Sequence, residues 1–200
     1  MAYERKDVHY RRAKAAGYRA RSAYKLVELD DRYHVLRAGD LVADLGAWPG
    51  AWLQVAAERV LPGGRVVGID LVRIDPLGPR NVASVIGDVR DPAAIAALVD
   101  HLGEPATVVL SDLAPKLTGI RDSDEARAAE LGAATLDVAR KLLRPGGRLV
   151  MKAFMNRDFR ALIERMRMDF EDVKTTKLEA TRRGSSELYV IAKGYRPSCG

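Results

Sequence analysis

The order of apolar runs and helical segments constrains the fold of this chain more than any other feature. Seven runs are typical of strands, namely 40–46, 65–70, 82–88, 106–112, 147–154, 171–179 and 186–195. Helical segments alternate with them, at 20–33, 51–60, 92–102, 122–143 and 157–170. This alternation indicates βαβ units, and the last two runs, with no helix between them, should pair antiparallel. We therefore predict an α/β fold with a seven-stranded, mostly parallel sheet, one antiparallel strand near an edge, and helices on both faces.

The net positive charge of the chain comes from its N-terminal segment. The 200 residues carry 33 Lys and Arg against 27 Asp and Glu, and residues 1–25 hold eight of the basic side chains but only two of the acidic ones. A basic segment on an otherwise neutral body favours a polyanionic partner such as nucleic acid, although a solvated basic helix has the same composition. We expect a basic extension at 1–21 and one domain at 22–197.

Cysteine and histidine usage excludes several classes of site. The only cysteine, Cys199, rules out a disulfide framework and a Cys-based zinc site, and it fits a reducing, cytoplasmic compartment. His9, His34 and His101 have no metal-ligand spacing, so we predict no metal site. The sequence has no run of about 18 apolar residues, the length of a membrane span, and we expect a monomer without a membrane partner.

The first strand-like run leads into the sequence "DLGAWPGAW" (44–52). Gly46 and Gly50 bracket a tight turn, where small residues let the backbone approach a ligand closely. The following helix offers its N-terminus to a carboxylate or a phosphate. The turn is not GxGxxG and lacks a P-loop lysine, which disfavours a nicotinamide or ATP site.

Acidic residues close the first four predicted strands, at the edge where doubly wound sheets bind ligands. They are Asp44, Asp70, Asp88 and Asp112. Asp70 is placed to accept hydrogen bonds from a ribose diol, and Asp88 to face an adenine amino group, although Asp88 or Asp91 could instead cap the next helix. The set suits a ligand with a ribose, an adenine and a positive charge, and S-adenosylmethionine has all three.

Lys152 interrupts the apolar run "RLVMKAFMN" (148–156). A lysine is rarely buried without a partner, because burying its charge is costly. One interpretation is a lysine at a strand end that reaches solvent along its own stem. The other is a functional lysine at the ligand edge of the sheet. The local pattern leaves both open.

Seven motifs together resemble the FtsJ/RrmJ-type ribose 2'-O-methyltransferases, which have a Rossmann-like class I fold and whose bacterial and archaeal members methylate a uridine of large-subunit ribosomal RNA. The motifs are "RSAYKLVELDDRY", "DLGAWPGAW", "GIDL", "GDVRD", "SDLAPKLTG", "VMKAF" and "SSELYVIAKG". Their order and spacing are specific, and the resemblance extends from about residue 8 to residue 196, nearly the whole chain.

The resemblance implies a set of functional residues. The positions that match the catalytic tetrad of the family are Lys25, Asp112, Lys152 and Glu187. Positions implied to contact S-adenosylmethionine are Gly50, Trp52, Asp70, Asp88 and Asp112, beside Gly46 of the turn. The chain departs from the family pattern at Trp48 and Ala51, and again at the "MN" that follows "KAF". On periodicity alone, Lys25 is more typical of a solvated helix face, and Glu187 of an outward-facing edge residue.

A lysine that serves as a base needs a lowered pKa, which burial and a neighbouring cation both provide. Lys152 is the predicted base, Lys25 is expected to orient the ribose hydroxyl, and Glu187 to position a lysine or the ribose. For RNA binding we expect arginines of the N-terminal segment and of the loop before Glu187, namely Arg11, Arg12, Arg19, Arg21, Arg182 and Arg183.

Three other functions remain open at this stage. The same chemistry on a transfer RNA anticodon loop uses the same motifs. A non-catalytic, RNA-binding ribosome assembly factor is a second alternative, although the intact tetrad disfavours it. A nicotinamide oxidoreductase is disfavoured by the missing GxGxxG.

Overall fold

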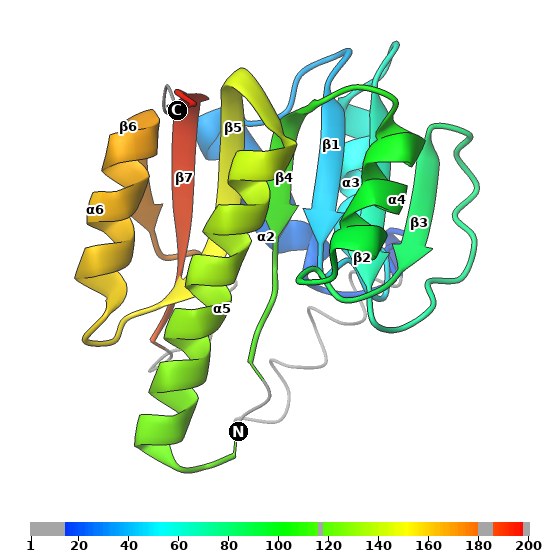
Figure 1. The fold of residues 1–200 in the computed structure, drawn as a ribbon. Helices are drawn as coiled ribbons and strands as arrows, with labels where there is room; N and C mark the ends of the chain where they lie inside the picture. The colour runs from blue at the N-terminus through cyan, green and yellow to red at the C-terminus, as the bar shows by residue number, and fades with distance from the viewer. Residues whose placement is uncertain (1–14, 116–117, 180–185, 198–200) are drawn as a thin grey trace.

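The strands form one seven-stranded sheet in the order β3-β2-β1-β4-β5-β7-β6 (Figure 1). The computed structural model describes residues 15–115, 118–179 and 186–197. The strands are β1 (Leu41–Leu45), β2 (Arg65–Asp70), β3 (Val82–Ile86), β4 (Ala106–Ser111), β5 (Leu143–Phe154), β6 (Phe170–Thr176) and β7 (Glu187–Tyr195). β7 pairs antiparallel with both β5 and β6, whereas the pairs among β1 to β5 are parallel. The predicted mixed sheet, with one reversed strand next to an edge, is confirmed.

Helices cover both faces of the sheet, as predicted (Figure 1). α2 (Ala23–Tyr33) and α3 (Ala51–Arg59) pack on one face, and α4 (Pro92–Leu102), α5 (Arg121–Leu142) and α6 (Phe159–Asp169) pack on the other. Each face has its own core of fully buried side chains. Leu26 and Leu53 belong to the first core, and Leu98 and Leu136 to the second. Burial on both faces explains why the central strands are almost continuously apolar.

β5 begins earlier than predicted, at Leu143 instead of residue 147. Ala106 of β4 pairs with Leu143, but Val108 pairs with Arg148, so the ladder is irregular between these two points. The residues that intervene on β5 include the "RPGG" turn signal. The proline and the two glycines therefore lie within β5, where they make its pairing with β4 irregular, and they do not form a separate turn between α5 and β5.

The topology brings distant parts of the chain to one edge of the sheet. β1, β2, β4 and β5 run in the same direction, so their C-terminal ends meet there. β7 runs the opposite way, and its first residue, Glu187, pairs with Phe154 at the end of β5. One edge of the sheet therefore holds the residues that follow β1, β2, β4 and β5, together with the first residues of β7. Ligands of α/β proteins bind at this edge.

The segment before α2 packs on the body of the domain. Tyr18 and Ala20 lie against the core under α2 and α3, and Gln54 of α3 donates a hydrogen bond from Nε2 to the carbonyl of Gly17. The division predicted between residues 21 and 22 therefore does not coincide with a break in packing. Arg11, Arg12, Arg182 and Arg183 lie outside the described residues.

Candidate active site

Lys152 points toward the end of β4. Its Nζ donates to Oδ1 of Asp112 at 2.9 Å and to the backbone carbonyl of the same residue at 2.8 Å. The Lys152 side chain is only 8% exposed, so it does not reach solvent along its stem. Partnering by a carboxylate and a carbonyl explains how a cation is tolerated within a buried strand.

Lys25 and Glu187 form a second lysine–carboxylate pair. Nζ of Lys25 lies 2.6 Å from Oε1 of Glu187, although the two residues are 162 positions apart in the sequence. The side chains are 13% and 16% exposed. The interpretation of Lys25 as a solvated face residue and of Glu187 as an outward edge residue is therefore wrong, because each is largely buried against the other.

Tyr189 joins the two pairs, and the sequence motifs alone did not identify it. Its hydroxyl donates to Oδ1 of Asp112 at 2.6 Å and accepts from Nζ of Lys25 at 3.2 Å. Lys25 Nζ also lies 5.5 Å from the centroid of the Tyr189 ring. Burial and the nearby carboxylates of Asp112 and Glu187 raise the pKa of Tyr189 far above its ordinary value, so the hydroxyl stays protonated.

The strand period offered one signal for Tyr189. Side chains two residues apart on a strand lie on the same face, so Tyr189 shares a face of β7 with Glu187. The register of the sheet completes the arrangement, since Tyr189 pairs with Lys152 across the β5–β7 ladder. This register depends on tertiary structure and could not be read from the motif.

A cavity of about 720 Å³, here called the cofactor cavity, lies beside this network. It is lined by the ends of β1, β2 and β4, by the residues that follow β3, and by one side of α5. Four of the six predicted cofactor residues line it, namely Gly46, Asp70, Asp88 and Asp112. Trp48, Leu71 and the α5 residues Arg127, Glu130 and Leu131 also line it. No sequence motif marks the α5 residues of this wall, because the sequence alone does not show which face of a long helix turns toward the cavity.

The turn after β1 brings backbone close to the cofactor cavity. Gly46 has a φ of +80°, and a Cβ added there would lie 2.5 Å from Cδ2 of Leu113. Only glycine satisfies both the left-handed backbone and the close approach. The backbone amide of Trp48 donates to Oδ2 of Asp70, and that of Val72 donates to Oδ1, each at 2.9 Å. The Asp70 carboxylate is therefore held in place before any ligand binds.

Asp88 and Asp44 differ in their surroundings. The Asp88 carboxylate accepts hydrogen bonds from Arg90, which lower its pKa to about 2. Asp91, not Asp88, caps α4, by accepting from the amide of Ala93. Asp44 is buried, and its two carboxylate oxygens have no hydrogen-bond partner among the described residues. Desolvation, assisted by the charges of Asp112 and Asp70, raises the pKa of Asp44 well above its ordinary value.

Gly50 and Trp52 do not line the cofactor cavity. Gly50 begins α3 with a φ of +104°, and a Cβ there would lie 3.1 Å from Nη1 of Arg19. The indole Nε1 of Trp52 donates to the carbonyl of Ser22 at 2.9 Å, and its ring lies 6.0 Å from that of Tyr189. Gly50 lies in the turn next to Arg19, and Trp52 packs near Tyr189 of the network. A contact of either residue with a cofactor stays a prediction.

Arg19 occupies a different place from the one expected for an RNA-binding residue. Its guanidinium donates to the carbonyls of Pro49, Asp75 and Pro76, and its backbone amide donates to Oε1 of Gln54. These contacts connect the turn after β1 with the loop after β2. The guanidinium is thus engaged with the main chain, which makes it a structural link. Arg21 is half-buried, and its part in RNA binding stays a prediction.

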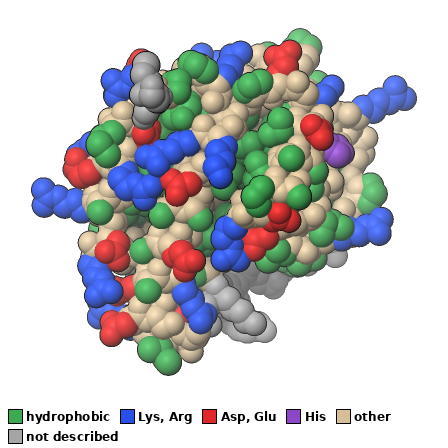
Figure 2. Space-filling view, viewed as in Figure 1, with side chains coloured by type: hydrophobic (Ala, Val, Ile, Leu, Met, Phe, Trp, Pro, Cys, Tyr) green, Lys and Arg blue, Asp and Glu red, His purple; other side chains and the backbone are tan. Residues whose placement is uncertain are grey.

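Two negative findings concern the described residues alone. No helix among them is long and apolar enough to cross a membrane. Within the same ranges, no group of three or more His, Cys, Asp or Glu side chains is arranged to hold a metal ion. On the face shown in Figure 2, acidic and basic side chains are intermixed over α5, without a patch of a single sign.

The sheet order, the glycine turn and the acidic cavity at the strand ends define a Rossmann-like methyltransferase. A family model described as FtsJ-like methyltransferase matches residues 18–195. Curated proteins named Ribosomal RNA large subunit methyltransferase E are 46% identical in Methanothrix thermoacetophila, over 96% of this chain and 74% of the relative, and in Syntrophobacter fumaroxidans, over 99% and 100%. The chain belongs to the FtsJ-like methyltransferase family.

Solved structures agree with this assignment. A crystal structure of a protein described as a ribosomal RNA methyltransferase from Plasmodium falciparum has a TM-score of 0.80 and 27% identity, covering 89% of this chain and 98% of its own. Fibrillarin from Aeropyrum pernix, solved with bound S-adenosyl-L-methionine, has a TM-score of 0.55 and 18% identity, covering 79% of this chain and 68% of its own. The second likeness shows the fold alone.

S-adenosylmethionine is the cofactor of the family, as predicted, and the residues of the cavity fit it. Carboxylates surround the cavity, which suits a cationic ligand, and the Asp70 carboxylate is fixed in a position to accept from a ribose diol. Gly46 of the turn lines the cavity, and it carries no side chain that would occupy the space beside Leu113. No residue of the cavity wall contradicts the family assignment.

Proposed function

We propose that this protein methylates the 2'-hydroxyl of a uridine ribose in large-subunit ribosomal RNA. The observation that carries the proposal is the network of two lysine–carboxylate pairs, linked by Tyr189, at the edge of the cofactor cavity. Relatives at 46% identity that cover nearly the whole chain are named as methyltransferases of large-subunit ribosomal RNA. Their name supports the substrate, and the network supports the chemistry.

The reaction needs a base, because a ribose hydroxyl becomes a good nucleophile only as it loses its proton. When bound, S-adenosylmethionine supplies an electrophilic methyl group attached to a sulfonium. Lys152 is proposed to take the proton of the 2'-hydroxyl on Nζ, once this nitrogen is a neutral amine. Asp112 orients Nζ through its carboxylate and its carbonyl, which restricts the position of the base to one point at the strand edge.

The second pair is proposed to hold the acceptor ribose. Glu187 and the Tyr189 hydroxyl each accept one hydrogen bond from Nζ of Lys25, and the third proton of that ammonium is proposed to reach a ribose oxygen. The cation also favours negative charge on the attacking oxygen. Tyr189 keeps the Lys25 side and the Asp112 side of the network at a fixed separation, since its hydroxyl contacts both.

RNA binding is proposed to involve the basic N-terminal segment, through Arg11, Arg12 and Arg21, and the loop with Arg182 and Arg183. That loop directly precedes Ser186 and Glu187 in the sequence. A monomer and a cytoplasmic location are further parts of the proposal, supported by composition and by the substrate named for the relatives.

The decisive experiment is transfer of labelled methyl groups from S-adenosylmethionine to large ribosomal subunits, naked ribosomal RNA and transfer RNA, offered separately. Nuclease digestion and mass spectrometry then locate the modified nucleotide. We expect a 2'-O-methyluridine in large-subunit RNA. Modification of transfer RNA alone would assign the protein to the anticodon-loop alternative. Binding of ribosomal RNA without transfer to any acceptor would support the non-catalytic assembly factor.

A further inference from the structure

A second cavity is lined by residues close in the sequence to Asp112, Lys152 and Glu187, and by the first turns of α5. It has a volume of about 310 Å³, and its lining includes Pro115, Ala128, Phe154, Met155, Asn156 and Ser186. Pro115 also lines the cofactor cavity, so the two cavities meet at the segment that follows β4. We call the second one the acceptor cavity. It contains both residues of the "MN" departure noted in the sequence, for which the proposed chemistry has no use.

The walls of the acceptor cavity continue from the strands that carry the tetrad. Pro115 comes three residues after Asp112, Phe154 two residues after Lys152, and Ser186 immediately before Glu187. Phe154 pairs with Glu187 across the β5–β7 ladder, and the backbone amide of Met155 donates to the carbonyl of Ser186 at 2.9 Å. The same backbone segments therefore fix the tetrad and the cavity together.

The structure of a nucleotide places its nucleobase next to the reacting oxygen. The carbon that bears the 2'-hydroxyl is bonded directly to the carbon that bears the base, so the base must lie beside the tetrad. Tyr189 and Trp52 fill the space behind the network, and the methyl donor takes the cofactor cavity. Among the described residues, the acceptor cavity is a hollow that the three tetrad-bearing strand ends border together, through Pro115, Phe154 and Ser186.

The lining suits an uncharged base better than a phosphate. Arg121, Asp124 and Glu125 lie at the cavity. Arg121 is paired with Glu125 at 2.9 Å, so the charge of Asp124 is left over, and this negative charge disfavours a phosphate. Pro115, Ala128, Phe154 and Met155 provide apolar surface for the faces of a base. Met155 is 55% exposed and carries a polarisable sulfur that contacts aromatic rings favourably.

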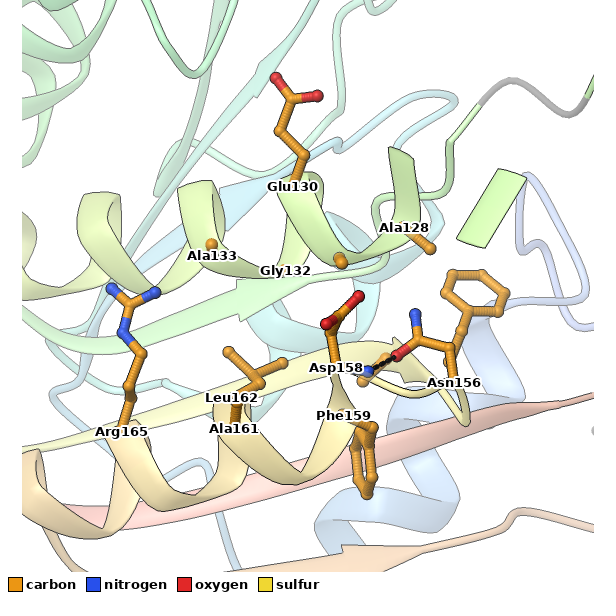
Figure 3. A pocket seen from close by; sticks show the side chains of 13 residues that line it. Ala128, Glu130, Gly132, Ala133, Asn156, Asp158, Phe159, Ala161, Leu162 and Arg165 are labelled. Atoms are coloured by element: carbon orange, nitrogen blue, oxygen red, sulfur yellow. Dashed lines mark hydrogen bonds between the residues drawn. The ribbon is translucent and has the colours of Figure 1, made fainter. Parts of the chain in front are cut away.

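Asn156 provides polar groups at one end of the cavity. Its Oδ1 accepts from the amide of Asp158 at 3.1 Å, and its Nδ2 donates to the carbonyl of Glu125 at 3.3 Å. Figure 3 shows this side chain near Ala128, at the end of a groove between α5 and α6 that reaches Arg165. One amide proton and one oxygen lone pair stay available, which matches the alternating acceptors and donor on the edge of a uracil.

We propose that the acceptor cavity binds the base of the nucleotide that is methylated, with Met155 against its face and Asn156 at its edge. The proposal rests on the proposed function and adds a specificity site to it. It assigns a role to Met155 and Asn156, one of the departures from the family pattern noted in the sequence.

Steady-state kinetics on the full-length protein test the proposal. Met155→Ala and Asn156→Ala should each raise the KM for large-subunit RNA about tenfold, as expected for the loss of one base contact. The Kd of S-adenosylmethionine, measured by calorimetry without RNA, should stay unchanged. Met168→Ala is the matched control, because Met168 is 69% exposed on α6 and lies outside the cavity. An unchanged KM in both cavity variants would overturn the proposal.

Photocrosslinking gives a readout that does not depend on turnover. 4-Thiouridine is placed at the nucleotide that the wild-type protein methylates, and the crosslinked peptide is identified by mass spectrometry. We expect the peptide that contains residues 154–156. A crosslink to the turn around Trp48 instead would overturn the base site while the proposed function stands. Absence of any methylated nucleotide with the wild-type protein would overturn both.

Discussion

The hydroxyl group of Tyr189, in the buried middle stretch of β7, lies 2.6 Å from Oδ1 of Asp112. This contact connects the carboxylate that orients Lys152 with the ammonium of Lys25, 3.2 Å from the same hydroxyl. The two lysine–carboxylate pairs are thus parts of one network, and the hydroxyl is the point that both share.

Tyr189→Phe should separate the two pairs without emptying the core. Loss of one buried hydrogen-bonding group costs about 1–2 kcal/mol, so we expect kcat to fall roughly tenfold and the melting temperature to fall by a few degrees. The Kd of S-adenosylmethionine should not change, because Tyr189 does not line the cofactor cavity. Single-turnover kinetics with calorimetry checks this, and a weaker cofactor affinity with unchanged kcat would contradict it.

Lys152→Met should abolish methyl transfer while the protein stays folded. Methionine fills a similar volume but cannot accept a proton, so we expect the rate to fall by at least about a hundredfold, the lower end of the effect of a general base. The measurement is transfer of labelled methyl, with cofactor binding as the control for the site. Full turnover in this variant with normal cofactor binding would show that Lys152 is not the base.

Arg19→Ala should weaken cofactor binding although Arg19 does not line the cavity. The guanidinium connects Pro49 of the glycine turn with Asp75 and Pro76 after β2, so its loss frees both loops. We expect the Kd of S-adenosylmethionine to rise about tenfold, equivalent to about 1.4 kcal/mol.

Arg59→Ala is the matched control for Arg19→Ala. Arg59 bonds to Asp30 and Asp31 of α2, away from the cofactor turns, so its loss should lower the melting temperature and leave the Kd unchanged. An equal loss of affinity in both arginine variants would attribute the effect to general destabilisation.

The buried Asp44 predicts a particular pH dependence of stability. Its raised pKa means that the folded state holds the proton more tightly than the unfolded chain, whose pKa is about 3.9. Stability therefore falls as the pH rises above the unfolded pKa, until the folded-state pKa is passed. Asp44→Asn removes this titration. The free energy of unfolding of the variant relative to wild type should increase between about pH 4 and pH 7, measured by urea unfolding. A constant difference across that range would contradict it.

The fold was predictable because most strands contain a short apolar run bounded by turn residues, so the order of elements determines the sheet. The acidic residues at the strand ends were predictable for the same reason, and four of the six expected cofactor residues line the cavity. Residues that act through long-range contacts were not. The bond from Tyr189 to Asp112 depends on sheet register, and the α5 wall depends on the rotation of a helix against the sheet.

Arg19 shows a second limit of sequence reasoning. In a basic segment the arginines cannot be told apart by their sequence surroundings. Only the fold shows which of them donates to main-chain carbonyls and which is exposed to solvent. The two loops that Arg19 bonds lie 30 and 56 or more positions away in the sequence. No local periodicity encodes such a contact, so composition assigned to Arg19 a role that its geometry does not support.

The reversed direction of β7 has a consequence for the order in which the protein matures. The ribosome makes Lys25 early and Glu187 only after most of the chain, yet the two form one ion pair. β7 is also the strand that joins β6 to the rest of the sheet. A nascent chain that ends before β7 thus contains every residue that lines the cofactor cavity but lacks Glu187 and Tyr189 of the network. Glu187 and Tyr189, which complete the network of the two lysine–carboxylate pairs, are therefore among the last of its residues to be synthesised.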